Sequence, residues 1–258
     1  MNSFDNMTVT AIKEYLATKD LQLYPDLIAN LKKDPRVAVK KIAESLEKKV
    51  IARNKEVDRI VKMKSIEASY YNKGIRTIGG MDEVGRGPLA GPVVTCVLIL
   101  KPDSCRLYVN DSKKVSKKNR EILCQQLIED AVDYAIGQVD NEIIDALNIL
   151  NATKKAMTDS LSSLTVKPEL LLIDALRVDT EIPQKSIIHG DASSYAIAAA
   201  SIVAKVYRDN LMQIYHEQYP EYGFDHNMGY GTAEHIKALQ KYGPTPIHRS
   251  TFIKNLGL

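Results

Sequence analysis

The 258-residue sequence predicts an α/β protein with a mixed β-sheet, preceded by a small all-helical segment. Three observations lead to this prediction. Residues 1–72 carry apolar residues at helical spacing and almost no strand pattern. From about residue 73 onward, short apolar runs alternate with longer helical patterns. Two of these runs, at 77–81 and 92–100, are separated by about ten residues, too few for a helical crossover, so they should pair antiparallel.

The helical segment is predicted to contain three helices. Apolar residues at 9, 12 and 16 indicate the first, and Pro25 is typical of the first turn of the second. A longer pattern beginning at Val39 continues through Val57 and Val61 until the sequence at 72–74 ends it. We therefore expect one long third helix and a domain boundary between residues 72 and 73.

Charge is distributed unevenly along the chain. The net charge of +3 is too small to indicate a polyanionic partner by itself. Residues 1–72, however, hold 14 Lys and Arg against 10 Asp and Glu, whereas the remainder holds 21 against 22. The positive excess therefore lies in the helical segment, which makes auxiliary binding of a nucleic-acid duplex a possible role for residues 1–72.

Several classes of protein are disfavoured by composition. No run of 18 apolar residues occurs, so no membrane span is expected. The N-terminus lacks the pattern of a secretory signal, and we expect a cytoplasmic protein. The three cysteines, Cys96, Cys105 and Cys124, show no metal-type spacing, so no zinc site is expected.

Elements of the main domain follow from the apolar patterns. Ser116 is the expected N-cap of one helix, and the small residues that follow Ser193 indicate a helix able to pack tightly on the sheet. The helix over 141–164 should turn Ile143, Leu147, Leu150 and Met157 inward. The predicted strands lie at 77–81, 92–100, 134–139, 169–174 and 186–189, and the predicted helices at 117–131, 141–164 and 193–215.

Acidic residues stand where predicted strands end. Asp82 and Glu83 follow the first run, Asp174 closes a run of four apolar residues, and Asp191 precedes the small-residue helix. Converging carboxylates repel one another unless cations lie between them, and Mg²⁺ or Mn²⁺ prefers such oxygen ligands. Each Asp is equally compatible with turn or cap chemistry. Neighbours on a regular strand face opposite sides, so Asp82 and Glu83 share a site only if the backbone already turns at Glu83.

A glycine-rich turn follows these acids. Two residues of the sequence Gly85-Arg86-Gly87-Pro88 lack a Cβ, so main-chain groups can approach a ligand closely. Discrimination between RNA and DNA requires contact with the 2′-hydroxyl, which such a turn can supply. The turn does not fit a dinucleotide fingerprint, because Ala90 occupies the third glycine position.

Taken as a whole, the stretch GGMDEVGRGPLAGPVV resembles the signature of bacterial ribonuclease HII. The resemblance continues, in the family's order, over about residues 73–254. It includes the segments DSKKVSKKNRE (111–121), LLLIDA (170–175), HGDASSYAIAAASIVAKVYRD (189–209), YPEYGFDHNMGYGTAEH (219–235) and YGPTPIHRSTF (242–252). The related ribonuclease HIII type carries Thr between the glycines and a β-rich N-terminal domain. Arg86 and the helical segment here favour ribonuclease HII.

The resemblance implies a ribonuclease H-like sheet flanked by helices over 73–258. It further implies hydrolysis of the RNA strand of RNA–DNA hybrids, and cleavage 5′ to single ribonucleotides in duplex DNA, leaving a 5′-phosphate and a 3′-hydroxyl. Two Mn²⁺ or Mg²⁺ ions would activate the attacking water. The implied cellular role of the enzyme is the removal of ribonucleotides from DNA. The implied catalytic and metal-binding residues are Asp82, Glu83, Asp174 and Asp191, and the implied substrate-binding residues are Gly85, Arg86, Gly87, Ser112, Lys113 and Tyr230.

Some features stay open at this point. The family usually has glycine where this chain has Ala175. A DNA-cutting nuclease of the same fold class, or an inactive hybrid-binding protein, is an alternative. Beyond RNA–DNA hybrids and ribonucleotide-containing duplexes, no obligate protein partner is predicted.

The remaining charged residues and histidines carry weaker predictions. We expect a run of basic residues to contact phosphate, and Lys205 and Arg208 are further candidates for the same role. Asp209 is compatible with an ion pair or with catalysis, and structural roles are expected for His189 and His248. The basic run consists of Lys113, Lys114, Lys117, Lys118 and Arg120.

Overall fold

The structure is a computed structural model, which describes residues 4, 6–19 and 24–256. The chain divides into two compact units, Met1–Val61 and Lys62–Leu258. Each unit is treated by itself below.

The first unit contains the three predicted helices, α1 (Val9–Ala17), α2 (Tyr24–Lys32) and most of α3 (Val37–Met63). Thr8 caps α1 by accepting a hydrogen bond from the backbone N–H of Ala11. The prediction of one helix up to residue 72 was wrong, because α3 ends at Met63 and a separate helix, α4 (Ser65–Tyr71), follows. The core of the unit includes Ile12, Leu16, Ile28, Leu31, Val39, Ala43 and Leu46.

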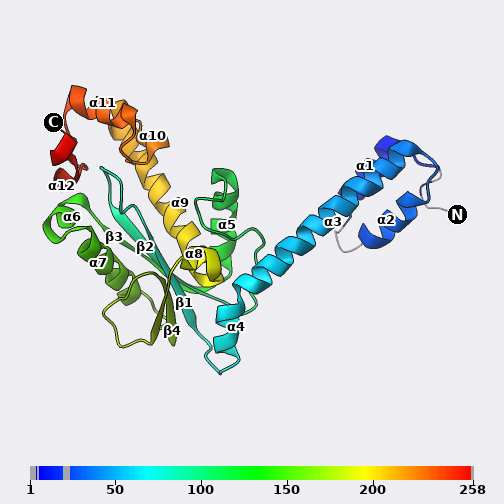
Figure 1. Cartoon of the computed structure of the whole chain (residues 1–258), viewed down its shortest axis with the longest axis horizontal. Coiled ribbons are helices and arrows are strands. Elements are labelled where there is room, and N and C mark those ends of the chain that lie inside the picture. The colour runs from blue at the N-terminus through cyan, green and yellow to red at the C-terminus, as the bar shows by residue number, and fades with distance from the viewer. Residues whose placement is uncertain (1–3, 5, 20–23, 257–258) are drawn as a thin grey trace. The chain divides into compact units, whose positions relative to one another are not determined.

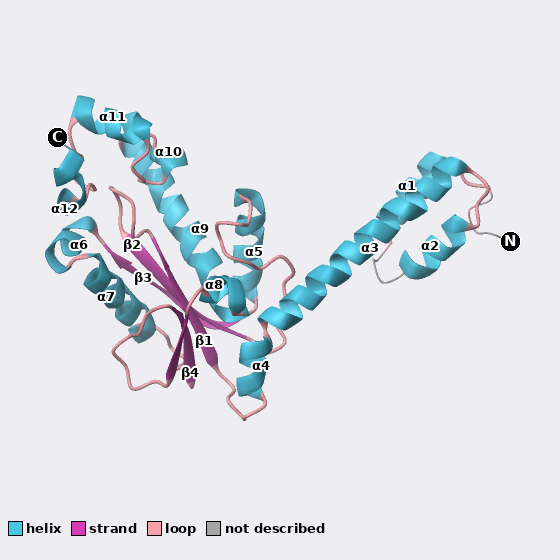
Figure 2. Cartoon of the chain, in the orientation of Figure 1, coloured by secondary structure: helices cyan, strands magenta, loops and turns pink. Residues whose placement is uncertain are grey.

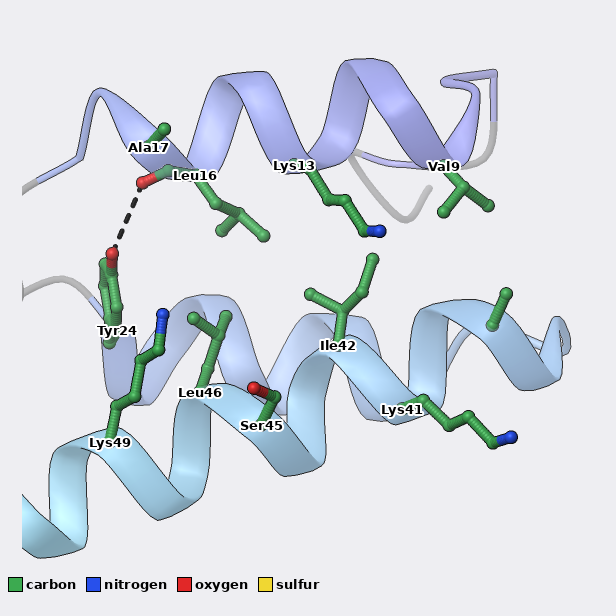
Figure 3. A pocket seen from close by; sticks show the side chains of 11 residues that line it. Val9, Lys13, Leu16, Ala17, Tyr24, Lys41, Ile42, Ser45, Leu46 and Lys49 are labelled. Atoms are coloured by element: carbon green, nitrogen blue, oxygen red, sulfur yellow. Dashed lines mark hydrogen bonds between the residues drawn. The ribbon is translucent and has the colours of Figure 1, made fainter.

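A groove of about 580 Å³ runs between α1 and α3 (Figure 3). Its apolar lining includes Leu16, Ile42 and Leu46, and at one end the hydroxyl of Tyr24 donates a hydrogen bond to the carbonyl of Leu16. Three lysines also line it, namely Lys13, Lys41 and Lys49. The groove therefore combines an apolar lining with positive charge.

The second unit is built on a five-stranded mixed sheet in the order β3-β2-β1-β4-β5. β1 pairs antiparallel with β2, as predicted, and parallel with β4, which in turn pairs parallel with β5. Every residue of β2 is buried, as its continuous apolar sequence predicts. The strands are β1 (Ile78–Val84), β2 (Val93–Leu100), β3 (Ala131–Val139), β4 (Leu170–Asp174) and β5 (Gln184–Ile187).

Helices cover both faces of this sheet, with α7 on one and α9 on the other (Figures 1 and 2). α5 packs beside α9, and its N-cap is Ser116, as predicted. The α-helices are α5 (Lys117–Glu129), α6 (Asn141–Leu147), α7 (Ile149–Ser162), α8 (Gly190–Ser193), α9 (Tyr195–Gln218), α10 (Phe224–Asn227), α11 (Ala233–Tyr242) and α12 (Ser250–Ile253). The 3₁₀ helices are η2 (Pro220–Tyr222) and η3 (Lys254–Leu256).

Two details of the predicted helices were wrong. The helix expected over 141–164 is interrupted at Asn148, whose φ of 67° is left-handed and whose side chain caps α7. Leu147 and Leu150, which flank the interruption, are each 41% exposed instead of facing the core. The helix expected from residue 193 is likewise divided into α8 and α9 by Ser194.

The small residues of α9 allow the close approach that they predict. A Cβ placed on Gly80 of β1 would lie 2.1 Å from the carbonyl oxygen of Ala196, so only glycine fits there. This contact brings the first turns of α9 against the strand that carries Asp82. Among the described residues, no helix is long and apolar enough to cross a membrane.

Candidate active site

The register of two neighbouring strands brings the central carboxylates together. Met81 of β1 pairs with Ile173 of β4 in a parallel ladder. Asp82 and Asp174 are the next residues on these strands, so they lie side by side on adjacent strands. Asp191, in the first turn of α8, is tied to them because the N–H of Gly190 donates to Asp174 Oδ1 at 2.7 Å. Strand pairing and the short α8 therefore gather three acids at one sheet edge.

Glu83 reaches the same cleft in a way that the sequence did not predict. The backbone does not turn at this residue, because β1 continues to Val84, which pairs with Val94 of β2. Glu83 nevertheless lines the same cleft as Asp82 at the end of the strand. Its Oε1 accepts a bond from Arg86 at 3.2 Å, while its Oε2 is buried and has no hydrogen-bond partner among the described residues.

Burial and mutual repulsion hold these acids in an unfavourable environment. Burial, followed by the negative charge of Glu83, raises the pKa of Asp82 well above its usual range. Burial likewise raises the pKa of Glu83, although Arg86 opposes the shift. The pKa of Asp191 is raised by burial and by the charges of Asp111 and Asp174. A cation placed among these groups would reverse the penalty.

The carboxylates of the cleft suit hard divalent ions, although they do not form a complete coordination shell. Among the residues that the structure describes, no group of three or more His, Cys, Asp or Glu side chains is arranged to hold a metal ion as it stands. The cleft is lined by four carboxylates without a His or Cys, which is the ligand chemistry of Mg²⁺ and Mn²⁺. The orphaned Oε2 of Glu83 is an acceptor that an ion would satisfy. The four carboxylates therefore fit a site for Mg²⁺ or Mn²⁺.

The glycine-rich turn forms a second wall of the cleft. Gly85 has a φ of 89°, and a Cβ there would lie 2.2 Å from Arg208 Nε, so glycine is required. Gly87 faces Tyr230, whose side chain is 40% exposed. The turn and this tyrosine thus bound one open space next to the acids.

All ten predicted site residues line this single cleft of about 590 Å³. Sequence reasoning missed Ser201, which lines the cleft and donates a 2.9 Å hydrogen bond to the buried Ser112 hydroxyl. Its position one helical turn before Lys205, on the helix that follows Asp191, was the signal available. The cleft is lined by Asp82, Glu83, Val84, Gly85, Arg86, Gly87, Ser112, Lys113, Asp174, Asp191, Ser201, Lys205 and Tyr230.

The bases expected to contact phosphate separate into two groups. Lys113 is exposed and lines the cleft, whereas Arg120 is buried and donates to the carbonyls of Ser112 and Val115. The prediction for Arg120 was therefore wrong. It also pairs with Asp209, which accepts a 2.6 Å bond from Lys205.

Two further outcomes concern Asp209 and the last of these bases. Of the two roles considered for Asp209, the structure shows the ion pair. Arg208 is fully buried, with its guanidinium on backbone carbonyls, so phosphate contact was wrong for it as well.

Comparison with known proteins gives the same picture along most of the chain. The model of the Ribonuclease HII family matches residues 79–255, and that of the Ribonuclease HII N-terminal domain matches residues 8–71. The chain belongs to the ribonuclease HII family. The ribonuclease HII of Lactobacillus johnsonii is 48% identical over 95% of this chain and 97% of its own length. That of Enterococcus faecalis is 49% identical over 95% and 96%.

Solved structures agree on the fold. The crystal structure of the ribonuclease H2 from Pyrococcus horikoshii superimposes with a TM-score of 0.60 and 26% identity, covering 70% of this chain and 96% of that one. As a ribonuclease HII family member, the chain is a ribonuclease H, a metal-dependent hydrolase that cuts the RNA strand of RNA–DNA hybrids.

Proposed function

We propose that this enzyme also cuts duplex DNA on the 5′ side of single embedded ribonucleotides, leaving a 5′-phosphate and a 3′-hydroxyl, and that it thereby serves ribonucleotide removal in the cytoplasm. The observation that carries the proposal is one cleft that combines four carboxylates with the turn 85–87 and Tyr230. Because the turn and the tyrosine lie beside the acids, contact with a single ribose would be enough to place the cut.

Substrate recognition is assigned to the turn and the tyrosine. Backbone groups of Gly85, Arg86 and Gly87 would contact the 2′-hydroxyl, which only a ribonucleotide carries. The exposed ring of Tyr230 would pack on the ribose at the junction between RNA and DNA. Lys113, with Ser112 beside it, would contact a neighbouring phosphate.

Catalysis is assigned to the acids. Asp82 and Asp174 would be the central metal ligands, with Glu83 and Asp191 completing the site. Two Mg²⁺ or Mn²⁺ ions, when bound, would supply stabilisation of the attacking and leaving oxygens of the phosphodiester. Arg86 donates a hydrogen bond to Glu83 and the N–H of Gly190 donates one to Asp174, so the protein's own groups orient both acids.

A substrate panel tests this assignment against the two alternatives. Three labelled duplexes carry one ribonucleotide, an RNA tract or DNA alone, and each is incubated with Mg²⁺, Mn²⁺ or EDTA. We expect metal-dependent cleavage of the first two, none of the third, and loss of both activities in Asp82→Asn. Cleavage of the all-DNA duplex would favour a DNA nuclease of this fold class. Binding without any cleavage would favour the inactive hybrid-binding protein.

A further inference from the structure

Arg249 does not line the cleft, but its side chain binds backbone carbonyls of the glycine-rich turn. Its side chain is fully buried, and within the described part of the chain it forms no ion pair. All its recorded hydrogen bonds run to backbone carbonyls. Nη2 donates to Gly85 at 2.6 Å, Nη1 donates to Arg86 at 2.9 Å, and Nε and Nη2 both donate to Gly91 at 3.0 and 2.7 Å. Burial lowers the pKa of Arg249 to about 9, and the charge of Asp145 opposes this only in part, so burying the guanidinium here costs free energy.

Peptide geometry shows what these bonds do to the turn. In a trans peptide the carbonyl of one residue and the N–H of the next point in opposite directions. Because Arg249 draws the carbonyls of Gly85 and Arg86 inward, the N–H groups of Arg86 and Gly87 are directed away from it. No hydrogen bond from either N–H to another described group is found. Both residues line the cleft, so these two donors are left for a ligand there.

The preceding residue, His248, reaches the other wall through a second histidine. Its Nδ1 accepts from the N–H of Thr245 at 2.9 Å, so in the neutral ring Nε2 carries the proton and donates to His235 Nε2 at 2.9 Å. His235 Nδ1 then donates to the carbonyl of Tyr230 at 2.9 Å. Burial lowers the pKa of His248 to about 4, which keeps the chain of bonds in this neutral form.

The segment that carries both residues is fastened to the chain directly after the turn. Ala90 and His248 form an antiparallel bridge, and the N–H of Arg249 donates to the carbonyl of Leu89 at 2.8 Å. The two walls of the cleft, the turn and Tyr230, are therefore held by adjacent residues of one short segment.

We propose that His248 and Arg249 are positioning residues that set the separation and orientation of the turn 85–87 and Tyr230, and so determine how well a ribonucleotide is distinguished from a deoxyribonucleotide. This inference rests on the proposed function, because it assumes that the turn and Tyr230 read the ribose. Neither side chain touches the substrate. Their effect passes through backbone atoms of the residues that do.

The test measures discrimination instead of total activity. Dissociation constants are determined with Ca²⁺ in place of Mg²⁺, for a duplex with one ribonucleotide and for the same duplex in DNA. Arg249→Lys keeps the charge but loses the planar fork. We expect it to reduce the ratio of the two constants about tenfold, the equivalent of one well-made hydrogen bond, while affinity for the DNA duplex is unchanged. Arg106→Lys, a substitution at the Arg106–Asp130 pair outside the cleft, is the matched control and should leave the ratio unchanged.

A second variant covers the possibility that Arg249→Lys does not fold. His235→Phe keeps the aromatic packing with Tyr222 and Phe224 but cannot bond the carbonyl of Tyr230. It should reduce the same ratio, again without weakening DNA binding. A folded variant of either kind that discriminates like the unaltered protein overturns the inference. If the unaltered protein itself does not discriminate, the proposed function fails, and the inference fails with it.

Discussion

Gly87 faces the ring of Tyr230 so closely that a Cβ built on the glycine would lie 3.6 Å from Tyr230 Cε1. That distance is an ordinary van der Waals contact, so alanine fits the free protein. The methyl group would nevertheless occupy the space proposed for the ribose. We expect Gly87→Ala to leave the melting temperature unchanged and to lower kcat/KM on a ribonucleotide-containing duplex by roughly tenfold or more. A variant with normal kinetics would show that this space is not used.

Asp82 is buried beside two other acids, and burial raises its pKa. Replacing it with Asn removes the repulsion while preserving shape. We expect Asp82→Asn to abolish cleavage and to increase the free energy of unfolding in EDTA by about 1 kcal/mol, as at other sites where function opposes stability. Urea unfolding checks this, with the exposed Asp103→Asn as control. A lower free energy of unfolding for Asp82→Asn would show that repulsion among the buried acids does not destabilise the protein.

Ala175 directly follows Asp174 and has a φ of 48°, a left-handed conformation that favours glycine. Alanine pays roughly 1–2 kcal/mol there, whereas glycine costs more to order on folding, by about 0.5–1 kcal/mol. Because the side chain is exposed, little packing is lost. We expect Ala175→Gly to stabilise the protein by about 0.5–1 kcal/mol in denaturant unfolding. A destabilised variant would mean that the methyl group makes contacts that matter.

The buried histidine pair predicts a pH dependence of stability. Burial lowers the pKa of His248 to about 4 and also lowers that of His235. The unfolded chain therefore takes up protons first, so this contribution is fully present above pH 6.5 and is lost as the pH falls toward 4. The expected slope is at most about 1.4 kcal/mol per pH unit for each histidine.

The raised pKa values of the active-site acids act in the opposite direction, so the informative quantity is a difference. The free energy of unfolding is measured at several pH values from about 7.5 to about 4.5, a range that spans the titration of free histidine. His248→Gln, which does not titrate, should show a shallower fall than the unaltered protein. Equal slopes would mean that the pair is not held neutral.

The helical unit is proposed to help bind the duplex, since it carries the positive excess of the chain. A truncation should begin at Lys62, because Glu67 of α4 accepts bonds from Ser194 and Ala196 at the start of α9. We expect this truncation to raise KM several-fold, preserve kcat and weaken the salt dependence of binding. Unchanged KM and salt dependence would remove the proposed role.

The sequence was sufficient where one physical rule decided the outcome. The apolar runs that end at Asp82 and Asp174 indicate buried strands, and buried strands deliver these acids to a sheet edge. It was insufficient where tertiary contacts decided. Arg120 looks like a solvated base until the carbonyls of Ser112 and Val115 are seen around it. The interruption between α6 and α7 depends on the positive φ of Asn148, and the periodicity of apolar residues does not predict such a conformation.

The roles of adjacent side chains were hard to predict for a similar reason. Alternation along a strand places Asp82 and Glu83 on opposite faces, yet both line the cleft, because Glu83 stands near the end of β1. Ser201 lies within the segment 189–209 that carries the resemblance, but its spacing alone does not indicate the cleft, and the close packing of α9 on Gly80 brings it there.

The position of the cut in a DNA duplex with one embedded ribonucleotide tests the central claim most directly. The strand carrying the ribonucleotide is labelled at either end, and the products are compared with size markers of known termini. The account predicts one metal-dependent cut on the 5′ side of the ribonucleotide, with a 3′-hydroxyl on one product and a 5′-phosphate on the other. An uncut duplex, under conditions in which a long RNA–DNA hybrid is cleaved, would contradict the assignment of the turn 85–87 and Tyr230 as the sensor of a single ribose.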